Sequence, residues 1–245
     1  MVRRLSVTAC VALVAFLGGC AGTSVQTYSK PPSGERQYGK VKKVAVMRFD
    51  SVVEGAQAAR IAGDLFFQEL LARGTFEQVE EPRYVAELMK SLKLRNTENL
   101  DREVVRKIGE ELRAQALVLG EVLLYGQEQN SEIVEFALQV NLIDVESGDI
   151  LWSGRTVGHS STTLGEMLGI NQGPSVNTVA RRAVAQLVAR LDREYRKARK
   201  EEVERMLETA QAQQAPAEAP AAAEGQSEAG AEKAAEEILL QVKPK

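Results

Sequence analysis

Apolar side chains recur along this chain in two spacings, one typical of helices and one typical of strands. Spacings of three and four residues predict helices at 56–73 and 84–92. They predict a third helix that is capped by Asn99 or Asp101 and ends near Leu112, and a fourth that begins at Asn177. Short, nearly continuous apolar runs predict strands at 44–47, 76–79 and 116–124. Strict alternation from Val134 to Ile143, followed by residues 150–157, predicts two more strands.

The order of these elements predicts an α/β fold. The last three strands follow one another closely, and the turn at 144–149 joins two of them as a hairpin in which Gly148 supplies a positive φ. Close succession of strands excludes an all-parallel sheet. We therefore expect a single domain with a mixed sheet flanked by helices, a long C-terminal helix and a disordered C-terminal tail.

The flanking segments differ in composition from this core. Residues 20–40 are rich in Gly, Ser, Thr, Pro and Lys without apolar periodicity, and predict a flexible tether. The domain is expected to cover 41–206, with its last helix extending into solvent beyond Tyr195, where the apolar stripe fades. Residues 207–245 are a low-complexity tail: helix-forming charged residues continue to Gln214, and from Ala215 the composition of Ala, Glu, Pro, Gln and Gly predicts disorder.

The N-terminus has the pattern of a targeting segment. Arg3 and Arg4 precede an apolar run from Leu5 to Leu17 that only Ser6 and Thr8 interrupt. A secretory h-region is roughly 7–15 residues long, whereas a bilayer span needs about 20. Residues 1–19 are therefore interpreted as a signal peptide.

The residues that follow, Leu17-Gly18-Gly19-Cys20, resemble the bacterial lipobox. That resemblance implies a diacylglycerol on the Cys20 sulfur, cleavage before Cys20, and acylation of the new amine with a fatty acid such as palmitate. Ala21 stands where aspartate favours retention in the inner membrane, so the periplasmic face of the outer membrane is the expected location. The alternative is an ordinary buried thiol.

Composition and motifs give no support to catalysis. With Cys10 in the signal peptide and Cys20 lipidated, no thiol remains for disulfides or zinc, and His159 is the only histidine. The net charge of −3 does not indicate nucleic-acid binding. Ser160 and Ser161 lack a nucleophile elbow, while Glu80-Glu81 and Glu110-Glu111 are interpreted as solvated charges. We expect no enzyme activity, no catalytic residue, no cofactor and no metal.

Four segments in order resemble the curli-assembly (CsgG-like) family: KKVAVMRFD, LLARGTFEQVEEP, IGEELRAQALVLGEVLLYG and ALQVNLIDVESGDILWSG. Related periplasmic lipoproteins are LpoB-like activators of peptidoglycan synthases, and the TolB N-terminal domain is similar in fold. The resemblance covers about Val41 to Leu191 and implies a protein that works by assembly and contact. Pore-forming members insert two membrane hairpins, for which the loop at 158–175 is too short.

Several other residues have two readings each. Gly120 inside an apolar strand indicates a closely packed helix or a bulge. Trp152 is interpreted as a core or rim aromatic, with a binding platform as the alternative. The basic stretch Arg193, Arg196, Lys197, Arg199 and Lys200 is a solvated helix face or a site for anionic lipid or cell-wall polymer.

Two segments are candidate partner contacts. The first is the loop at 158–175, whose apolar residues dock a partner or fold onto the domain: Leu164, Met167, Leu168 and Ile170. The second is a short amphipathic stretch in the tail, whose spacing suits a partner's groove: Ala235, Ile238, Leu239 and Val242.

The sequence therefore predicts an outer-membrane lipoprotein that acts as a periplasmic adaptor or accessory factor in envelope assembly or secretion. Its expected partners are the outer membrane, through lipid on Cys20, and envelope proteins, with a homo-oligomer as a further option. The alternatives are a subunit of a CsgG-like export channel and an activator of a peptidoglycan synthase.

Overall fold

The computed structural model describes residues 22–29, 38–53, 56–93, 101–127, 133–160 and 173–214. The chain divides into two compact units between Arg205 and Met206. The first unit contains the sheet and its covering helices. In the second unit the described residues are 206–214, which belong to the last helix.

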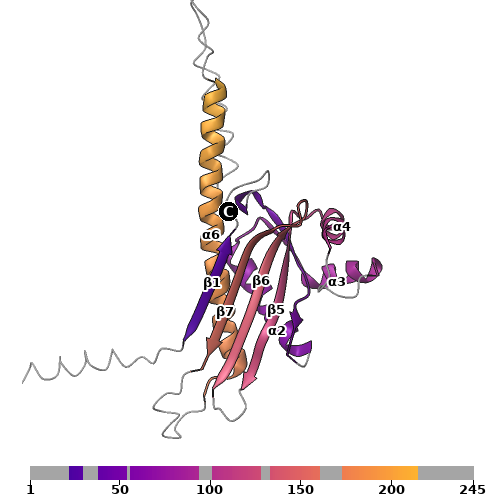
Figure 1. The fold of residues 1–245 in the computed structure, drawn as a ribbon, viewed down its shortest axis with the longest axis vertical. Coiled ribbons are helices and arrows are strands. Elements are labelled where there is room, and N and C mark those ends of the chain that lie inside the picture. The colour runs from indigo at the N-terminus through magenta and orange to yellow at the C-terminus, as the bar shows by residue number, and fades with distance from the viewer. Residues whose placement is uncertain are drawn as a thin grey trace, which may run out of the picture. The chain divides into compact units, whose positions relative to one another are not determined.

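The described strands form one mixed sheet (Figure 1). They are β1 (Thr23–Ser29), β2 (Lys43–Val46), β3 (Asp50–Ser51), β4 (Gln78–Glu80), β5 (Ala116–Gln127), β6 (Val134–Asp144) and β7 (Ile150–His159). Their order is β1-β7-β6-β5-β2-β4, and β3 pairs with β5. β2 is parallel to β4 and β5, whereas β5, β6, β7 and β1 pair antiparallel, so the predicted mixed sheet is confirmed.

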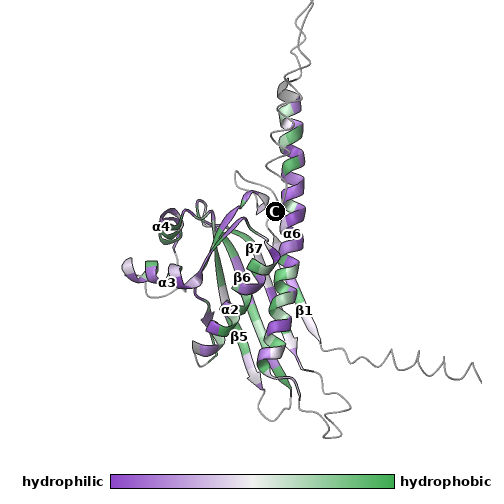
Figure 2. Cartoon of the chain, turned by 180° about the vertical axis from the view of Figure 1, so that it is seen from behind, coloured by the Kyte–Doolittle hydropathy of each residue, from purple (hydrophilic) through white to green (hydrophobic). Residues whose placement is uncertain are grey.

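Helices lie on both faces of the sheet. α2 (Ala56–Arg73) and α6 (Val176–Gln214) cover one face, which is turned toward the viewer in Figure 2. α3 (Pro82–Ser91) and α4 (Arg102–Leu112) lie on the other face, against β2 and β5. None of the helices in the described ranges is both long and apolar enough to span a bilayer.

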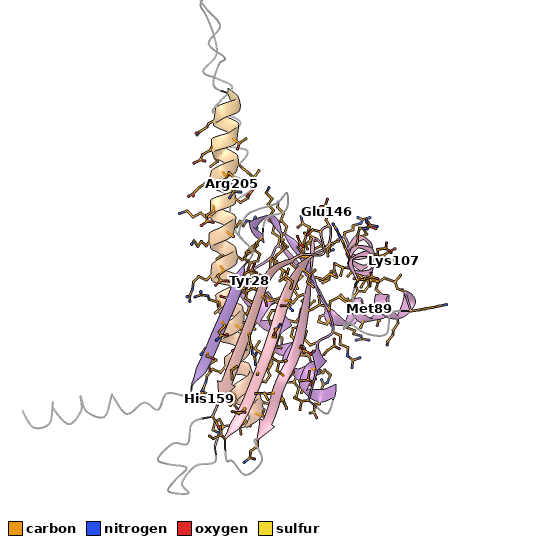
Figure 3. All side chains as sticks on the ribbon, viewed as in Figure 1. Tyr28, Met89, Lys107, Glu146, His159 and Arg205 are labelled. Atoms are coloured by element: carbon orange, nitrogen blue, oxygen red, sulfur yellow. The ribbon has the colours of Figure 1, made fainter. Side chains whose placement is uncertain are left out.

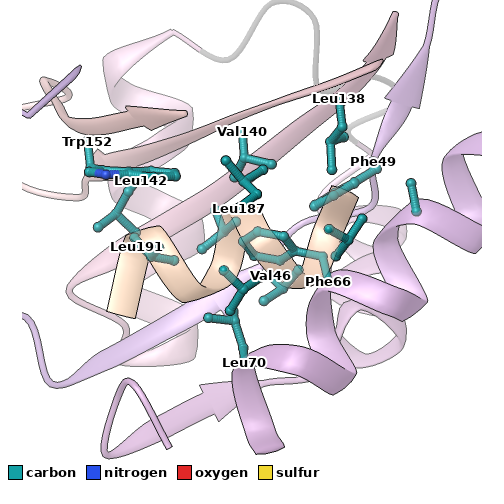
Figure 4. Close-up of a cluster of buried hydrophobic side chains, with 14 of the residues drawn as sticks. Val46, Phe49, Phe66, Leu70, Leu138, Val140, Leu142, Trp152, Leu187 and Leu191 are labelled. Carbon is teal, nitrogen blue, oxygen red and sulfur yellow. The ribbon is translucent and has the colours of Figure 1, made fainter. Parts of the chain in front are cut away.

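The larger core lies between the sheet, α2 and the first part of α6 (Figure 4). β6 directs every second side chain into it, and these side chains are buried: Phe136, Leu138, Val140 and Leu142. The apolar stripe of α6 meets them with Val184, Leu187 and Leu191, as its spacing predicts. A smaller core joins α3 and α4 to β2 and β5 through Met47, Val85, Ile108 and Leu117.

Local sequence signals set several element ends. α2 ends where Gly74 takes a φ of +59°. Asp101, not Asn99, caps α4, because its Oδ1 accepts the Val104 N–H at 2.8 Å. Gly148 has a φ of +72° in the β6–β7 turn, as predicted.

The tether prediction for residues 20–40 is wrong over two segments. Thr23–Ser29 is strand β1, fully paired with β7, and Tyr38–Lys40 forms a 3-10 turn. Tyr38 is buried and its Oη donates to the Leu191 carbonyl at 3.1 Å. Both segments are held in place by residues far away in the sequence. Their own sequences therefore show no apolar periodicity that predicts a strand or a helical turn. The folded domain therefore begins before Val41.

The expectation that α6 extends into solvent beyond Tyr195 is wrong as far as Glu202, whereas the helix residues from Glu204 to Gln211 are mostly exposed, as predicted. Arg199 Nη2 lies 2.7 Å from Glu77 Oε1, and a Cβ on Gly39 would come within 2.6 Å of the Ala198 backbone. Glu202 is only 5% exposed and pairs with Lys40 at 3.0 Å and Arg205 at 2.6 Å. Charged residues of this turn therefore pack on the domain through ion pairs, which an apolar stripe does not reveal.

The close neighbour of Gly120 is a side chain, and not the helix that we predicted as one of two options. A Cβ there would lie 2.5 Å from the Phe49 ring, which packs on Phe66 with ring centroids 5.5 Å apart. The bulge falls a few residues later, between Val122 and Leu124. Gly120 thus makes room for an aromatic side chain from the β2–β3 connection.

Candidate functional site at the first strand and the open sheet face

β1 is an edge strand whose two faces differ. It pairs with β7 in the register Thr23↔Gly158 to Ser29↔Trp152. Val25 packs against the larger core and Thr27 bonds to α6, so these residues face the helices. The alternate residues Ser24 and Gln26 are exposed, and Tyr28 is 59% exposed. Alternation along the strand therefore gives β1 one structural face and one free face.

Glu194 of α6 fastens β1 and β7 to the helix. Its Oε1 accepts the Thr27 Oγ1–H at 2.8 Å, and its Oε2 accepts the Trp152 Nε1–H at 2.8 Å. Arg190 also donates to this carboxylate from the preceding turn of α6. Trp152 is fully buried, so the core interpretation is confirmed and the platform alternative is wrong. The carboxylate supplies the acceptor that its buried indole requires.

Beyond α3 and α4, no other described helix or strand covers the second face of the sheet. Figure 1 shows β1, β7, β6 and β5 side by side in front of α2 and α6. The pairings align Gln26, Arg155, Gln139 and Glu121 in one row across the four strands. The next row aligns Tyr28, Ser153 and Asn141 and ends at Leu119, which packs against the smaller core. We call the side chains of these two rows other than Leu119, together with Ser24, the open face.

The open face combines an aromatic ring with charged and amide groups. Ser153 Oγ donates to Asn141 Oδ1 at 2.6 Å, which fixes two of its polar side chains. Arg155 and Glu121 are exposed, and no ion pair of either with another described residue is found. An exposed Tyr beside Arg and amide groups is a composition typical of contact surfaces. The polar half of the β6 alternation is the sequence signal that could have located this face.

One end of the sheet gathers the start of β1, the end of β7, the start of β6 and the end of β5. Order reaches back to Gly22, whose carbonyl accepts the His159 N–H at 3.2 Å. The His159 imidazole occupies the space in which a Cβ on Gly22 would lie. Leu124 is 42% exposed and Ile133 is 39% exposed at this same end. We call it the Gly22 end.

The opposite part of the domain holds a polar cluster around α6. Tyr195 Oη donates to the Val41 carbonyl and accepts from Arg199 Nη1 at 3.1 Å. Burial raises the pKa of Tyr195, and it raises the pKa of Tyr38 well above its ordinary value. The hydrogen bond from Arg199 lowers the pKa of Glu77. These groups serve to lock the turn at Tyr38–Lys40 onto α6.

The predicted contact residues lie mostly outside the described residues. They are Cys20, Leu164, Met167, Leu168, Ile170, Ile238, Leu239 and Val242. Their roles therefore stay predictions. The neighbouring described residues, Gly22 and Ser160, are ordered parts of the sheet end, and Ser160 Oγ accepts the Val134 N–H at 2.9 Å.

Four of the five residues of the basic stretch on α6 form intramolecular pairs. Arg196 pairs with Asp192 at 2.9 Å, and Arg199 pairs with Glu77. Lys197 and Lys200 lie 3.9 and 3.7 Å from the acidic residues one helical turn onward, Glu201 and Glu204. This arrangement favours the solvated helix face over a site for anionic polymer.

Ionisable residues in the other motifs also have structural surroundings. Glu80 lies 2.6 Å from Lys43, and Glu110 lies 3.8 Å from Arg106. His159 is exposed at the Gly22 end. Within the described ranges, no three His, Cys, Asp or Glu side chains are grouped so that they could hold a metal ion.

Similar folds occur among solved structures. A PelC dodecamer from Paraburkholderia phytofirmans is 18% identical over 70% of this chain and 98% of that chain, with a TM-score of 0.43. Lipoprotein GNA1162 from Neisseria meningitidis is 18% identical over 52% and 88%, with a TM-score of 0.41. The LpoB C-terminal domain from Escherichia coli is 18% identical over 62% and 94%, with a TM-score of 0.37.

No family model matches the sequence, and no curated protein matches it. The resemblance to the curli-assembly family is not shown by these comparisons and stays a prediction.

Proposed function

We propose that this protein is a non-catalytic adaptor, anchored by lipid on Cys20 to the periplasmic face of the outer membrane, that binds an envelope protein through the open face. The observation that carries the proposal is the four-stranded open face itself. Its edge strand begins at Thr23, three residues after the lipobox cysteine.

The side chains of the open face support a contact role. Tyr28 offers a large, rigid apolar surface with a polar tip, and Arg155 and Glu121 offer opposite charges about two strand spacings, or roughly 10 Å, apart. A partner with complementary charges is thereby fixed in register. Gln26, Gln139 and Asn141 supply both donors and acceptors between these points.

The hydrogen bonds and ion pairs of three acidic side chains support the proposal that the protein is not an enzyme. Glu194 accepts three hydrogen bonds, Glu202 bridges Lys40 and Arg205, and Glu77 bonds Arg199. These carboxylates thus link α6 to β1 and β7, to the turn at Tyr38–Lys40 and to the segment before β4, respectively. These three carboxylates therefore have structural roles.

Lipidation is tested by labelling cells with radioactive palmitate. We expect the wild-type protein to incorporate the label and to sediment with outer membranes, because acyl chains on one residue together anchor firmly. Cys20→Ser is expected to lose the label. Equal labelling of both proteins would contradict the anchor.

The contact role is tested by placing a photo-reactive amino acid in living cells at Gln26, on the open face. Gln57, which is exposed on α2, is the matched control site. We expect one discrete adduct from position 26, identified by mass spectrometry, and none from position 57. Equal adducts from both sites would contradict the proposal, and an adduct of twice the subunit mass would assign the open face to self-association.

A further inference from the structure

We infer that the Gly22 end of the sheet lies against the phospholipid headgroups, with the strands directed away from the bilayer. This inference rests on the proposed lipidation of Cys20. It adds an orientation, because it says which surface of the domain faces the membrane and which surfaces remain free for partners.

The chain between the lipid and the sheet is short enough to keep the Gly22 end at the headgroups. Gly22 is hydrogen-bonded to His159, so only Ala21 separates an ordered residue from Cys20. Two residues span at most about 7 Å even when fully extended. The headgroup layer of one leaflet is itself about 5–7 Å thick. The Gly22 end therefore cannot move out of reach of the headgroups.

The position of Gly22 is itself well secured. β1 pairs with β7 along its whole length, and Thr27 of β1 is bonded to Glu194 of α6. The His159 side chain fills the space beside the Gly22 α-carbon. Peeling β1 away to lengthen the connection would break these contacts together, so the short span acts on a rigid domain.

The side chains at the two ends of the sheet agree with this orientation. Leu124 and Ile133 expose apolar surface at the Gly22 end, which suits the boundary between headgroups and acyl chains. At the opposite end, the exposed Ile150 follows the exposed acidic residues Glu146 and Asp149 in the β6–β7 turn. Figure 3 shows His159 and Glu146 at opposite ends of the sheet. The eleven residues of β6 separate these ends by about 34 Å.

The orientation is tested with the lipidated full chain in vesicles of phosphatidylethanolamine and phosphatidylglycerol that contain a nitroxide-labelled lipid. A fluorophore is attached to a single introduced cysteine, either Gln127→Cys at the Gly22 end or Glu146→Cys at the opposite end. Both positions are exposed. We expect quenching by the nitroxide lipid to be several-fold stronger at position 127. Equal quenching at both positions, as for a domain lying flat on its open face, would overturn the inference.

A variant with a longer linker tests whether the short span between Cys20 and Gly22 causes the orientation. A Gly-Ser segment of about 20 residues inserted between Ala21 and Gly22 has a mean span of about 25 Å. We expect it to lower quenching at position 127 to the level of position 146, and quenching that survives the insertion would overturn the role of the short span. Palmitate labelling of the same samples separates the two proposals: unlabelled protein refutes the proposed function, whereas labelled protein without selective quenching refutes only the orientation.

Discussion

Glu194 shows how one side chain can join three elements. Its carboxylate receives donors from β1, β7 and α6, and one of them, Thr27, is 167 positions away in the sequence. The side chain is one-fifth exposed, so water competes weakly for these donors. Leaving the buried Trp152 indole N–H without an acceptor would cost folding free energy. Glu194 is therefore the most informative residue at which to test the packing of α6.

We predict that Glu194→Ala lowers the free energy of unfolding by about 1–3 kcal/mol, because three donors lose their acceptor. Urea unfolding measures the loss, and hydrogen exchange should show selective loss of protection in β1. Glu201→Ala makes the same change at an exposed position of α6 and should cost less than about 0.5 kcal/mol. Equal losses in the two variants would show that Glu194 does not act as a fastener.

Two glycines face the same aromatic ring and should respond in opposite ways to alanine. A Cβ on Gly120 would lie 2.5 Å from the Phe49 ring, whereas a Cβ on Gly63 of α2 would lie at an ordinary 3.5 Å. We predict that Gly120→Ala destabilises by about 1–3 kcal/mol through overpacking. Gly63→Ala should be neutral or stabilise by up to about 1 kcal/mol, as alanine does in a helix. Thermal unfolding of both variants checks this order.

At the scale of elements, α6 is held along its length by different forces. Its first five turns bury an apolar stripe that includes Val184, Leu187 and Leu191. The next turns use polar contacts, in which Arg199 reaches Glu77 and Glu202 reaches Lys40. The second kind of contact depends on pH, whereas the first does not.

The Glu77–Arg199 pair should give a measurable pH dependence. The hydrogen bond from Arg199 lowers the pKa of Glu77 in the folded state, so the unfolded state binds more protons near the ordinary glutamate pKa of about 4.3. The stabilisation is therefore present above that pH and is lost as the pH falls through the lowered folded pKa. Because both groups are partly exposed, we expect at most about 1 kcal/mol.

We predict that Glu77→Gln is less stable than the wild type near neutral pH and that this difference shrinks in acid. Urea unfolding at neutral pH and at about pH 3, well below the ordinary glutamate value, measures it. Glu87→Gln, at an exposed position of α3, should leave the unfolding free energy unchanged at both values. A difference that stays constant with pH would show that the ion pair does not carry the effect.

At the scale of the whole molecule, the buried core and the predicted contact in the tail belong to different parts of the sequence. The buried apolar residues found in the described ranges lie between Tyr38 and Tyr195. The chain divides into its two compact units after Arg205. The tail residues Ile238, Leu239 and Val242, which we predict to contact a partner, belong to the second unit.

Deletion of residues 232–245 should therefore leave the melting temperature of the folded domain unchanged. The same deletion should reduce the recovery of envelope partners in a pull-down, because it removes the predicted amphipathic stretch. Calorimetry and quantitative mass spectrometry measure the two effects. An unaltered pull-down would remove the tail from the contact surfaces, and a lowered melting temperature would show that it stabilises the domain.

The sequence by itself determined the elements whose signal is local. The apolar spacing of α2, the Asp101 cap of α4, and the alternation in β6 are properties of neighbouring residues, and the structure confirms each of them. The mixed sheet also followed from chain order, because three successive strands with a tight turn must pair antiparallel.

Only the tertiary structure decided the features that depend on distant partners. The polar segment Thr23–Ser29 becomes a strand because β7 offers it an open edge, and Glu194 and Glu202 find their partners through the docking of α6. The open face exists because α3 and α4 cover only part of the sheet. Such pairings join residues more than a hundred positions apart, so no local pattern of apolar and polar residues encodes them.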